Sequence, residues 1–421
     1  MPHDRCSSPD DRPAVRVYNR AMRILLLNLY YPPDTSATAK MAETVVNALA
    51  RENHVTILCG RPSYDPSERR AWRLVQTEEI ENVRVVRVGS SDFPRHKMKK
   101  RVLNYLTYTA LVVPRALFTG CDAVLAMTDP PFEGIIGAFL AALKRKPYFY
   151  NIRDMYPDMA VGGSIVAPGW LARVWEKLHR WAMKRAASVI VLGEDMRGRI
   201  MAKGIRAEQI EIVRDGTEIL PGAPQPVLDP EVIRKIRGDF RFVLLHAGNI
   251  GFYGAWDTLV GAAKKLSGDG IGFVFVGEGA QRAQLEAAAR GVSNICFLPF
   301  FPGSKIPSVL AAADAHLITV KRGLEGVVVP SKMYGILAAG KPIVAVAARE
   351  TDAVSLGEKQ GFSVGADPDR ADNLAEVIRG LAVDPMRVQQ MGLAALAAAP
   401  AYDRVKELQK FVQIVTRPRA R

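Results

Sequence analysis

The chain has 421 residues, of which 48% are hydrophobic and 24% are charged. This composition excludes a disordered or fibrous protein, and the length suggests roughly two to three domains. The formal net charge of +14 favours anionic partners such as phosphorylated ligands, acidic lipid surfaces or nucleic acid, although simple solubility explains it equally well. No run approaches the ~18–20 apolar residues of a membrane span. The polar residues 1–21 lack the apolar core of a signal peptide, so we expect a disordered extension before a fold that begins at Met22.

In chain order, a continuous apolar run at residues 23–30 is followed by helical spacing at residues 40–51, which predicts a strand, a loop and a helix. Helical stretches at residues 135–142 and 171–185 lie between several later strand-like runs. Those runs are at residues 54–59, 83–88, 123–127, 147–151 and 188–192. This alternation predicts a mostly parallel sheet that is covered on both faces.

A second series of the same kind follows a linker near residues 216–230. It has strand-like runs at 242–246, 273–276, 295–298, 315–319 and 343–346, and helical stretches at 255–266, 280–289, 306–312 and 332–339. We therefore predict an α/β protein of two doubly wound, Rossmann-like domains, residues 22–220 and 221–402. A final helix at residues 403–416 is expected to pack back on the first domain. Because ligands bind beyond the carboxyl ends of parallel strands, the active site is expected in the cleft between the domains.

The most informative segment is residues 324–342, which read LEGVVVPSKMYGILAAGKP. Pro330 suits a first helical turn and the Ser331 side chain can bond free backbone N–H groups, so the helix is expected to begin near Lys332. A helix N-terminus carries about half a positive charge, and a lysine beside it would strengthen a phosphate site. The alternative is a solvated lysine beside an ordinary helix cap.

Two glycine-containing turns follow predicted strands and are also candidates for phosphate binding. The loop at residues 246–256 contains Gly248, Asn249 and Gly251, and Gly277-Glu278-Gly279 follows the next strand. Glycines let a backbone approach phosphate oxygens closely. An ordinary strand-to-helix turn is the alternative for the second of them.

Polar residues end the predicted strand at residues 147–151, where NIRDMYPD begins. Asp154 in this stretch is a candidate to bind the sugar or to accept a proton from the acceptor. An ion pair with Arg153 or a helix cap would be purely structural alternatives.

Two stretches combine basic and aromatic residues in a way that suits an acidic membrane surface. Residues 95–101 read RHKMKKR and precede Tyr105 and Tyr108, and residues 170–185 hold three tryptophans among five basic residues. The alternative is a helix that packs by its aromatic face and exposes a basic one. Membrane contact and packing are equally supported for the first stretch, and packing is preferred for the second.

Taken together, the ordered motifs from Met22 to about Thr416 resemble glycosyltransferase family 4, retaining enzymes of the GT-B fold, and within it the WbuB-like transferases of O-antigen and exopolysaccharide synthesis. Besides the segment at 324–342, the motifs are LLNLYYPPDTSATAK, NIRDMYPD, IVRDGTEI, HAGNIGFYGAWDTL and FVGEGAQ. The resemblance implies a UDP-sugar donor, a polyprenyl-diphosphate-linked saccharide acceptor, and no metal or cofactor. It also implies peripheral attachment to the inner face of the cytoplasmic membrane. Nucleic acid is not expected as a partner, because that interpretation rests only on the positive charge and the sequence has no recognisable nucleic-acid-binding module.

The resemblance implies that Glu325 contacts the hydroxyls of the donor sugar, that Lys332 binds the diphosphate, and that Asp154 completes the catalytic set. Further donor contacts are implied at Gly248, Asn249, Gly251, Gly277, Glu278, Gly279, Pro330 and Ser331. Acceptor contacts are implied at Arg153 and in the loop that holds Ser36 and Ala37, which stand in place of paired glycines. An ordinary surface turn is an equal alternative for that loop.

This chain departs from the family pattern at three positions. Gly335 stands where a second glutamate usually holds the ribose, and Asn249 and Gly254 stand where an arginine and a lysine are usual. A non-catalytic GT-B protein that serves as a partner or scaffold for a true transferase is therefore the alternative function.

Overall fold

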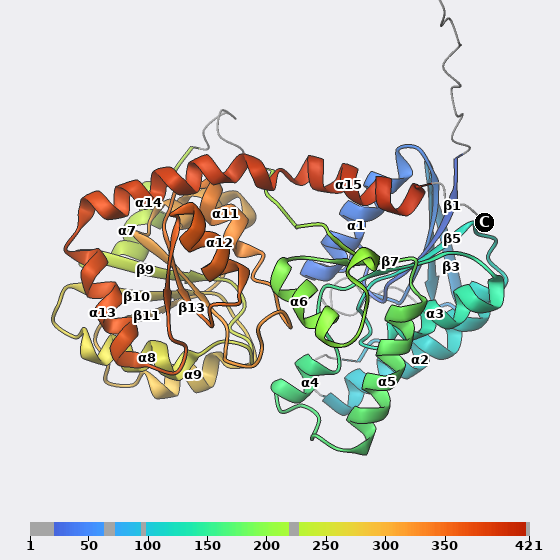
Figure 1. The fold of residues 1–421 in the computed structure, drawn as a ribbon, viewed down its shortest axis with the longest axis horizontal. Helices are drawn as coiled ribbons and strands as arrows, with labels where there is room; N and C mark the ends of the chain where they lie inside the picture. Colours follow the sequence, from blue (N-terminus) through green and yellow to red (C-terminus); the bar gives the residue numbers. More distant parts are fainter. Residues whose placement is uncertain (1–20, 63–71, 94–97, 219–226, 418–421) are drawn as a thin grey trace, which may run out of the picture.

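The computed structural model describes residues 21–62, 72–93, 98–218 and 227–417. They form two α/β domains that lie side by side, and α14 and α15 run along one edge of both domains (Figure 1). Residues 1–20 of the expected extension, the basic residues 95–97 and most of the linker lie outside the described residues.

The described part of the first domain contains an eight-stranded sheet in the order β3-β4-β2-β1-β5-β6-β7-β8. Its strands are parallel except for β3, which pairs antiparallel with β4 at the edge. The strands are β1 (Arg23–Leu27), β2 (His54–Cys59), β3 (Val75–Ile80), β4 (Val83–Val88), β5 (Ala123–Ala126), β6 (Tyr148–Asn151), β7 (Ser188–Val191) and β8 (Ile210–Ile212). The helices are α1 (Ala37–Ala50), α2 (Met98–Leu117), α3 (Glu133–Lys144), α4 (Asp158–Gly162), α5 (Trp170–Arg185) and α6 (Glu194–Ala202).

The described part of the second domain contains a six-stranded parallel sheet in the order β11-β10-β9-β12-β13-β14. The strands are β9 (Phe242–Ala247), β10 (Ile271–Val276), β11 (Ile295–Leu298), β12 (Ala315–Thr319), β13 (Ile343–Val346) and β14 (Ser363–Ala366). The helices are α7 (Pro230–Arg237), α8 (Trp256–Lys265), α9 (Arg282–Ala288), α10 (Ile306–Ala311), α11 (Lys332–Ala338), α12 (Asp352–Gln360), α13 (Ala371–Ala382) and α14 (Pro385–Ala398). The central strands are almost wholly buried, as expected for a sheet with helices on both faces.

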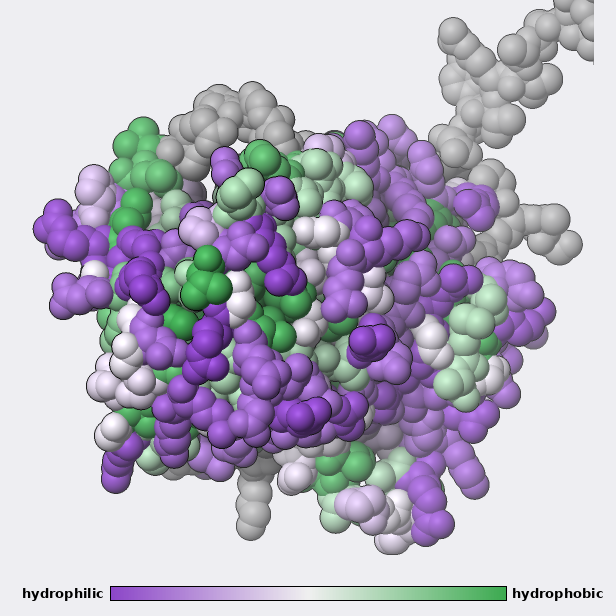
Figure 2. Space-filling view, turned by 60° about the vertical axis from the view of Figure 1, so that its left-hand side comes forward, coloured by the Kyte–Doolittle hydropathy of each residue, from purple (hydrophilic) through white to green (hydrophobic). Residues whose placement is uncertain are grey.

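The last helix, α15 (Arg404–Thr416), leaves the second domain and packs on the first. Its residues Phe411, Ile414 and Val415 are buried in the same apolar cluster as residues of α1 and β1. The Asp403 side chain caps α15 by accepting a hydrogen bond from Val405 N. On the face shown in Figure 2, hydrophilic residues cover most of the surface and hydrophobic residues lie in small separate groups.

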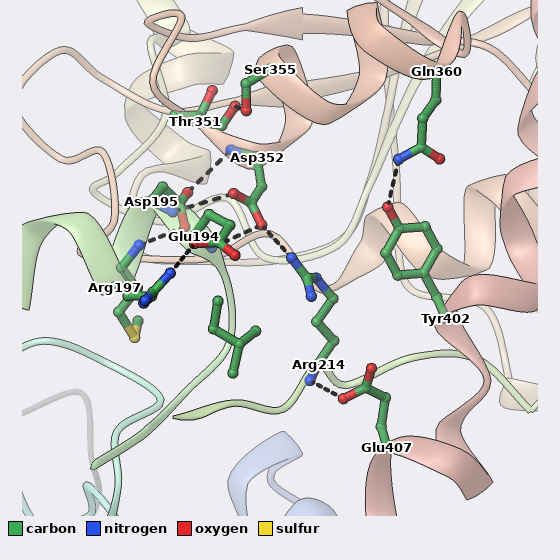
Figure 3. A network of polar contacts seen from close by, with 12 residues as sticks. Glu194, Asp195, Arg197, Arg214, Thr351, Asp352, Ser355, Gln360, Tyr402 and Glu407 are labelled. Atoms are coloured by element: carbon green, nitrogen blue, oxygen red, sulfur yellow. Dashed lines mark hydrogen bonds and ion pairs between the residues drawn. The ribbon is translucent and has the colours of Figure 1, made fainter. Parts of the chain in front are cut away.

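A polar network joins the two domains (Figure 3). Asp352, at the start of α12, is only 2% exposed. Its carboxylate accepts hydrogen bonds from the backbone N–H groups of Glu194 and Asp195, which begin α6. Arg214 forms an ion pair with Asp352 at 3.5 Å, and its own backbone N–H donates to Glu407 of α15. The buried carboxylate of Asp352 thus joins the second domain to the first, and Arg214 extends the network to α15.

Candidate active site

Two segments that the sequence singled out lie against each other at the domain junction. Met155 N donates a hydrogen bond of 3.1 Å to Val327 O, and Asp154 and Val328 form an isolated antiparallel β-bridge. Asp154 follows β6, and Val328 belongs to the segment between β12 and α11. Both segments therefore follow the carboxyl ends of strands, where ligands bind in parallel sheets.

Lys332 is the first residue of α11, and its side chain reaches the end of β9. Its Nζ lies 3.1 Å from Nε2 and 3.3 Å from Nδ1 of His246, and 3.4 Å from the point that a Cβ would occupy on Gly248. Burial lowers the pKa of Lys332 to about 7, and no carboxylate of the described chain offsets that shift. A partly buried ammonium group without a counter-charge favours an anionic ligand.

The loops after β9 and β10 pack tightly because glycines line their contact. Gly248 and Gly277 have φ values of 141° and 145°, and a Cβ on Gly277 would collide with the Gly248 carbonyl oxygen. The N–H groups of Gly248 and Gly277 donate to Val276 O and Leu298 O. These two glycines thus allow close approach, and their N–H groups are engaged within the protein.

Two other residues expected to bind the donor, Asn249 and Glu278, contact neighbouring residues of the second domain. Asn249 is exposed, and its carbonyl accepts a hydrogen bond of 2.9 Å from Tyr253 Oη. Glu278 forms an ion pair with Arg282 at 2.7 Å. The remaining members of this set, Gly251, Gly279 and Pro330, lie in the same loops and before α11.

Ser331 does not cap α11, so the prediction that its side chain bonds the free N–H groups is wrong. The residue is exposed, its backbone is already helical, and its side chain makes no capping hydrogen bond. A capping side chain needs the extended backbone that precedes most helices. The expected start of the helix at Lys332 is nevertheless observed.

Glu325 lies on a loop that is held against the first domain. Its Oε1 accepts a hydrogen bond of 2.8 Å from Gly323 N, and its carbonyl accepts one of 3.0 Å from Arg199 Nη1. Gly326 has a φ of 66°, and a Cβ there would collide with the backbone of Asp195. The loop that carries Glu325 is therefore fixed by backbone contacts with α6.

Asp154 and Arg153 do not form the ion pair that sequence offered as an alternative. Arg153 pairs with Asp215 at 2.6 Å. Burial, with a further contribution from the negative charge of Asp129, raises the pKa of Asp154 to about 6. A carboxyl group of this kind gains and loses a proton near neutral pH, as an acid–base group requires.

Ser36, which was expected in a loop that contacts the acceptor, has a structural role at the start of α1. Its Oγ accepts a hydrogen bond of 3.1 Å from Ala39 N, which caps α1, and the side chain is buried. Ala37 is the first residue of that helix and is exposed.

Comparison with known proteins places this geometry in a family. Residues 36–216 match the model of the glycosyl transferase 4-like domain, and residues 241–384 match that of the glycosyl transferases group 1. The chain belongs to the GT-B glycosyltransferases. This confirms the family-level resemblance seen in the sequence, and the finer WbuB-like assignment stays a prediction.

Individual proteins resemble this glycosyltransferase over most of its length. WcaI of Escherichia coli (strain K12), assigned to colanic acid biosynthesis as a glycosyl transferase, is 25% identical over 376 residues, which are 85% of this chain and 91% of that protein. The crystal structure of Anabaena HepE in complex with UDP and glucose has a TM-score of 0.68 at 17% identity and covers 94% of this chain and 100% of that one. WaaG, a glycosyltransferase involved in lipopolysaccharide biosynthesis, has a TM-score of 0.64 at 16% identity, with 94% and 100% covered. The two structures share the fold predicted from the sequence.

The sequence did not single out every polar residue of the glycosyltransferase cleft. His246 was predicted only as the first residue of a glycine-containing loop, and Asp129 was not predicted as a site residue. Asp129 follows β5, is 7% exposed, and raises the pKa of Asp154. Both residues lie at carboxyl ends of strands, and that position was the available signal.

The outer face of α5 is apolar and basic, so the preferred prediction that its aromatic face packs inside is wrong for Trp170 and Trp181, while Trp175 is partly buried and stacks on Tyr156. Trp170 is 66% exposed and Leu171 is 61% exposed, and Val174, Leu178 and Trp181 are exposed as well. The helix buries smaller residues instead, and His179 bonds Tyr150. In α2 the reverse holds, because Tyr105 and Tyr108 are buried while Leu103 and Leu106 are exposed.

A cavity of about 750 Å³ opens where α4, α5 and α6 meet the loop that precedes Glu325. Asp158 lines it and forms ion pairs of 3.0 Å with Arg199 and 2.8 Å with Lys203. Leu324 of the second domain contributes an apolar wall. Among the described residues, no helix of the glycosyltransferase has the length and apolarity to cross a membrane.

Proposed function

We propose that this protein is a retaining glycosyltransferase that transfers a sugar from a nucleotide diphosphate-sugar, a UDP-sugar, to a lipid-linked saccharide in cell-surface polysaccharide biosynthesis. The observation that carries the proposal is Lys332, a partly buried ammonium group at the cleft edge of the second domain, whose charge no described carboxylate balances. The names of the relatives support the choice of donor and pathway, since HepE was crystallised with UDP and WaaG acts in lipopolysaccharide biosynthesis.

In the proposed reaction, the bond between the sugar C1 and the diphosphate oxygen breaks and its electron pair stays on the diphosphate. A fixed cation that faces this growing charge lowers the barrier, and a single preorganised donor of this kind is worth about 10²–10³ in rate. Lys332 supplies that cation. Because α11 has only seven residues, its dipole adds less than the lysine does.

The acceptor hydroxyl oxygen then bonds to C1 on the face that the diphosphate leaves, which retains the configuration. Its proton passes to Asp154 or to an oxygen of the departing diphosphate. Glu325 orients the sugar by accepting hydrogen bonds from its hydroxyls. No second carboxylate in a hydrolytic pair is required by this scheme.

The acceptor is proposed to enter through the cavity between α5 and the Glu325 loop. The exposed apolar face of α5, flanked by basic residues, would then rest on an anionic membrane and bring a lipid-linked saccharide to the cavity. Basic side chains on this helix are Arg173, Lys177, Arg180, Lys184 and Arg185. We place the protein at the inner face of the cytoplasmic membrane on this basis.

Vesicle co-sedimentation tests the membrane contact. We expect the protein to sediment with vesicles that contain phosphatidylglycerol and not with pure phosphatidylcholine vesicles. The double variant Leu171→Glu/Leu178→Glu should lose this binding, and Leu393→Glu, at an exposed leucine of α14, should keep it. Equal sedimentation of all three proteins would refute the contact.

The function itself is tested by a screen of nucleotide-sugars followed by a transfer assay in the presence of EDTA. A ligand that binds the native state raises the melting temperature, and we expect UDP-sugars to do so without metal. Sustained release of UDP would exclude the non-catalytic scaffold that the departure at Gly335 left open. Stabilisation by no nucleotide-sugar would contradict the proposal.

A further inference from the structure

The proposed reaction leaves the buried imidazole next to Lys332 without a role. His246 is 1% exposed and is the next-to-last residue of β9, in the core of the second domain. Its ring packs edge-on against Trp256, with centroids 5.0 Å apart, and against Phe275 at 6.1 Å. Burial and the neighbouring charge of Lys332 hold the pKa of His246 well below its usual range. The imidazole is therefore neutral when it meets the ammonium group.

The contact between the two side chains positions the lysine without neutralising it. Nζ is nearly equidistant from the two ring nitrogens, at 3.1 and 3.3 Å, so it is not aligned with one lone pair as in a linear hydrogen bond. The same Nζ lies beside Gly248, whose missing side chain leaves it room. A carboxylate in place of His246 would hold the lysine equally near and would cancel its charge.

A second histidine whose pKa responds to Lys332, among the residues that the structure describes, is His316 of β12. This histidine is buried, its Nε2 contacts Leu310 O at 3.0 Å, and its pKa is lowered chiefly by burial. Both histidines are uncharged at neutral pH. Neither therefore adds a positive charge that would compete with Lys332 for the anion.

We propose that His246 is a positioning residue that holds the Lys332 ammonium towards the donor diphosphate and keeps its charge unpaired, so that donor binding draws a proton onto Lys332. The inference rests on the proposed function and adds proton uptake and a residue to it. The lowered pKa of Lys332 is consistent with it, because above pH 7 part of the population is neutral before the diphosphate arrives.

Calorimetric titration of UDP at pH 8 in Hepes and in Tris measures the proton uptake directly, since the two buffers have different ionisation enthalpies. We expect uptake of about one proton per UDP at pH 8, and less at pH 7. This measurement uses the unaltered protein, so it does not depend on the folding of a variant. Binding of UDP without proton uptake would overturn the inference.

Two substitutions test His246 itself. His246→Asp places a carboxylate beside Lys332, and we expect the Kd for UDP to rise by at least about tenfold. His246→Gln keeps a neutral acceptor and should bind UDP within about threefold of the unaltered protein. Inorganic pyrophosphate, used as a second probe, should show the same order because it carries only the diphosphate.

The two proposals fail in different ways. If the unaltered protein binds no nucleoside diphosphate, the proposed function is wrong. If it binds UDP and folded His246→Asp binds equally tightly, the donor site stands and the role of His246 is wrong.

Discussion

Asp195 and Asp352 cap each other's helix across the domain interface. The Asp352 carboxylate accepts a hydrogen bond of 3.2 Å from Asp195 N, and the Asp195 carboxylate accepts one of 3.4 Å from Asp352 N. Burial, and then the negative charge of Asp352, raises the pKa of Asp195 from 3.8 to about 7. The cost of placing two carboxylates together is reduced when Asp195 carries a proton.

This pair predicts a dependence of stability on pH. Because the pKa of Asp195 is raised in the folded state, its contribution is fully present below the ordinary value of 3.8 and is lost as pH rises through about 7. Asp195→Asn should therefore be more stable than the unaltered protein at pH 8, by about 1–2 kcal/mol. The difference in free energy of unfolding should shrink steadily between pH 7 and pH 4.

Urea denaturation at several pH values measures this difference. Asp257→Asn, at an exposed aspartate in the first turn of α8, is the control: it should cost at most about 1 kcal/mol, and that difference should stay constant between about pH 5 and pH 8. A constant difference between Asp195→Asn and the unaltered protein from pH 4 to pH 8 would show that the pair does not share a proton.

A second prediction concerns Asp154. If its carboxylate accepts the acceptor proton, kcat/KM should rise with pH and level off above an apparent pKa of about 6. Asp154→Asn should lower the rate by about 10²–10⁴-fold and remove that limb of the profile. If Asp154→Asn keeps both the rate and the rise of kcat/KM with pH, an oxygen of the departing diphosphate accepts the proton instead.

A third prediction separates sugar from nucleotide. Glu325 is proposed to touch only the donor sugar, so Glu325→Gln should lower kcat by about 10- to 100-fold and leave the Kd for UDP unchanged. Glu376→Gln, on the exposed side of α13, is the matched control. Equal loss of UDP binding and of turnover in Glu325→Gln would place this carboxylate at the nucleotide instead.

Gly335 provides a fourth test, because the structure has room for a side chain there. A Cβ at this position would meet only Leu310 Cδ1, at 3.7 Å, which is an ordinary contact. Gly335→Ala should stabilise the protein by up to about 1 kcal/mol through helix propensity. Gly335→Glu should bind UDP more tightly than Gly335→Ala if the position faces the ribose. Identical Kd values for the two variants would show that it does not.

The sequence predicted most of the central strands and missed several edge strands and helices, including β8 and β14. The central strands β9, β10 and β12 were found because a strand covered on both faces is a continuous apolar run. Strand β3 was missed because it lies at a sheet edge and reads VQTEEI, with mostly exposed side chains. Helices α12 to α14 were also not predicted.

The sequence predicted candidate site residues only where they share a local pattern with their neighbours in the chain. Glu325 and Lys332 were predicted as site residues because they flank the start of one helix, and their roles stay predictions. His246 and Lys332 are 86 positions apart, and Asp195 and Asp352 are 157 apart, so only the packing of strands and domains brings these partners together. The shifted pKa values of Lys332 and Asp195 arise from that packing and have no signal in the sequence.

The most direct test of the account is calorimetric titration of UDP, in EDTA, into the unaltered protein, Lys332→Met and Lys321→Met. Lys321 is an exposed lysine of the loop between β12 and α11 and serves as the control. We expect the unaltered protein and Lys321→Met to bind alike, and the Kd of Lys332→Met to rise by at least about tenfold, because a charge-assisted hydrogen bond to the diphosphate is lost. Equal affinity of all three proteins for UDP would contradict the assignment of Lys332 as the diphosphate-binding cation.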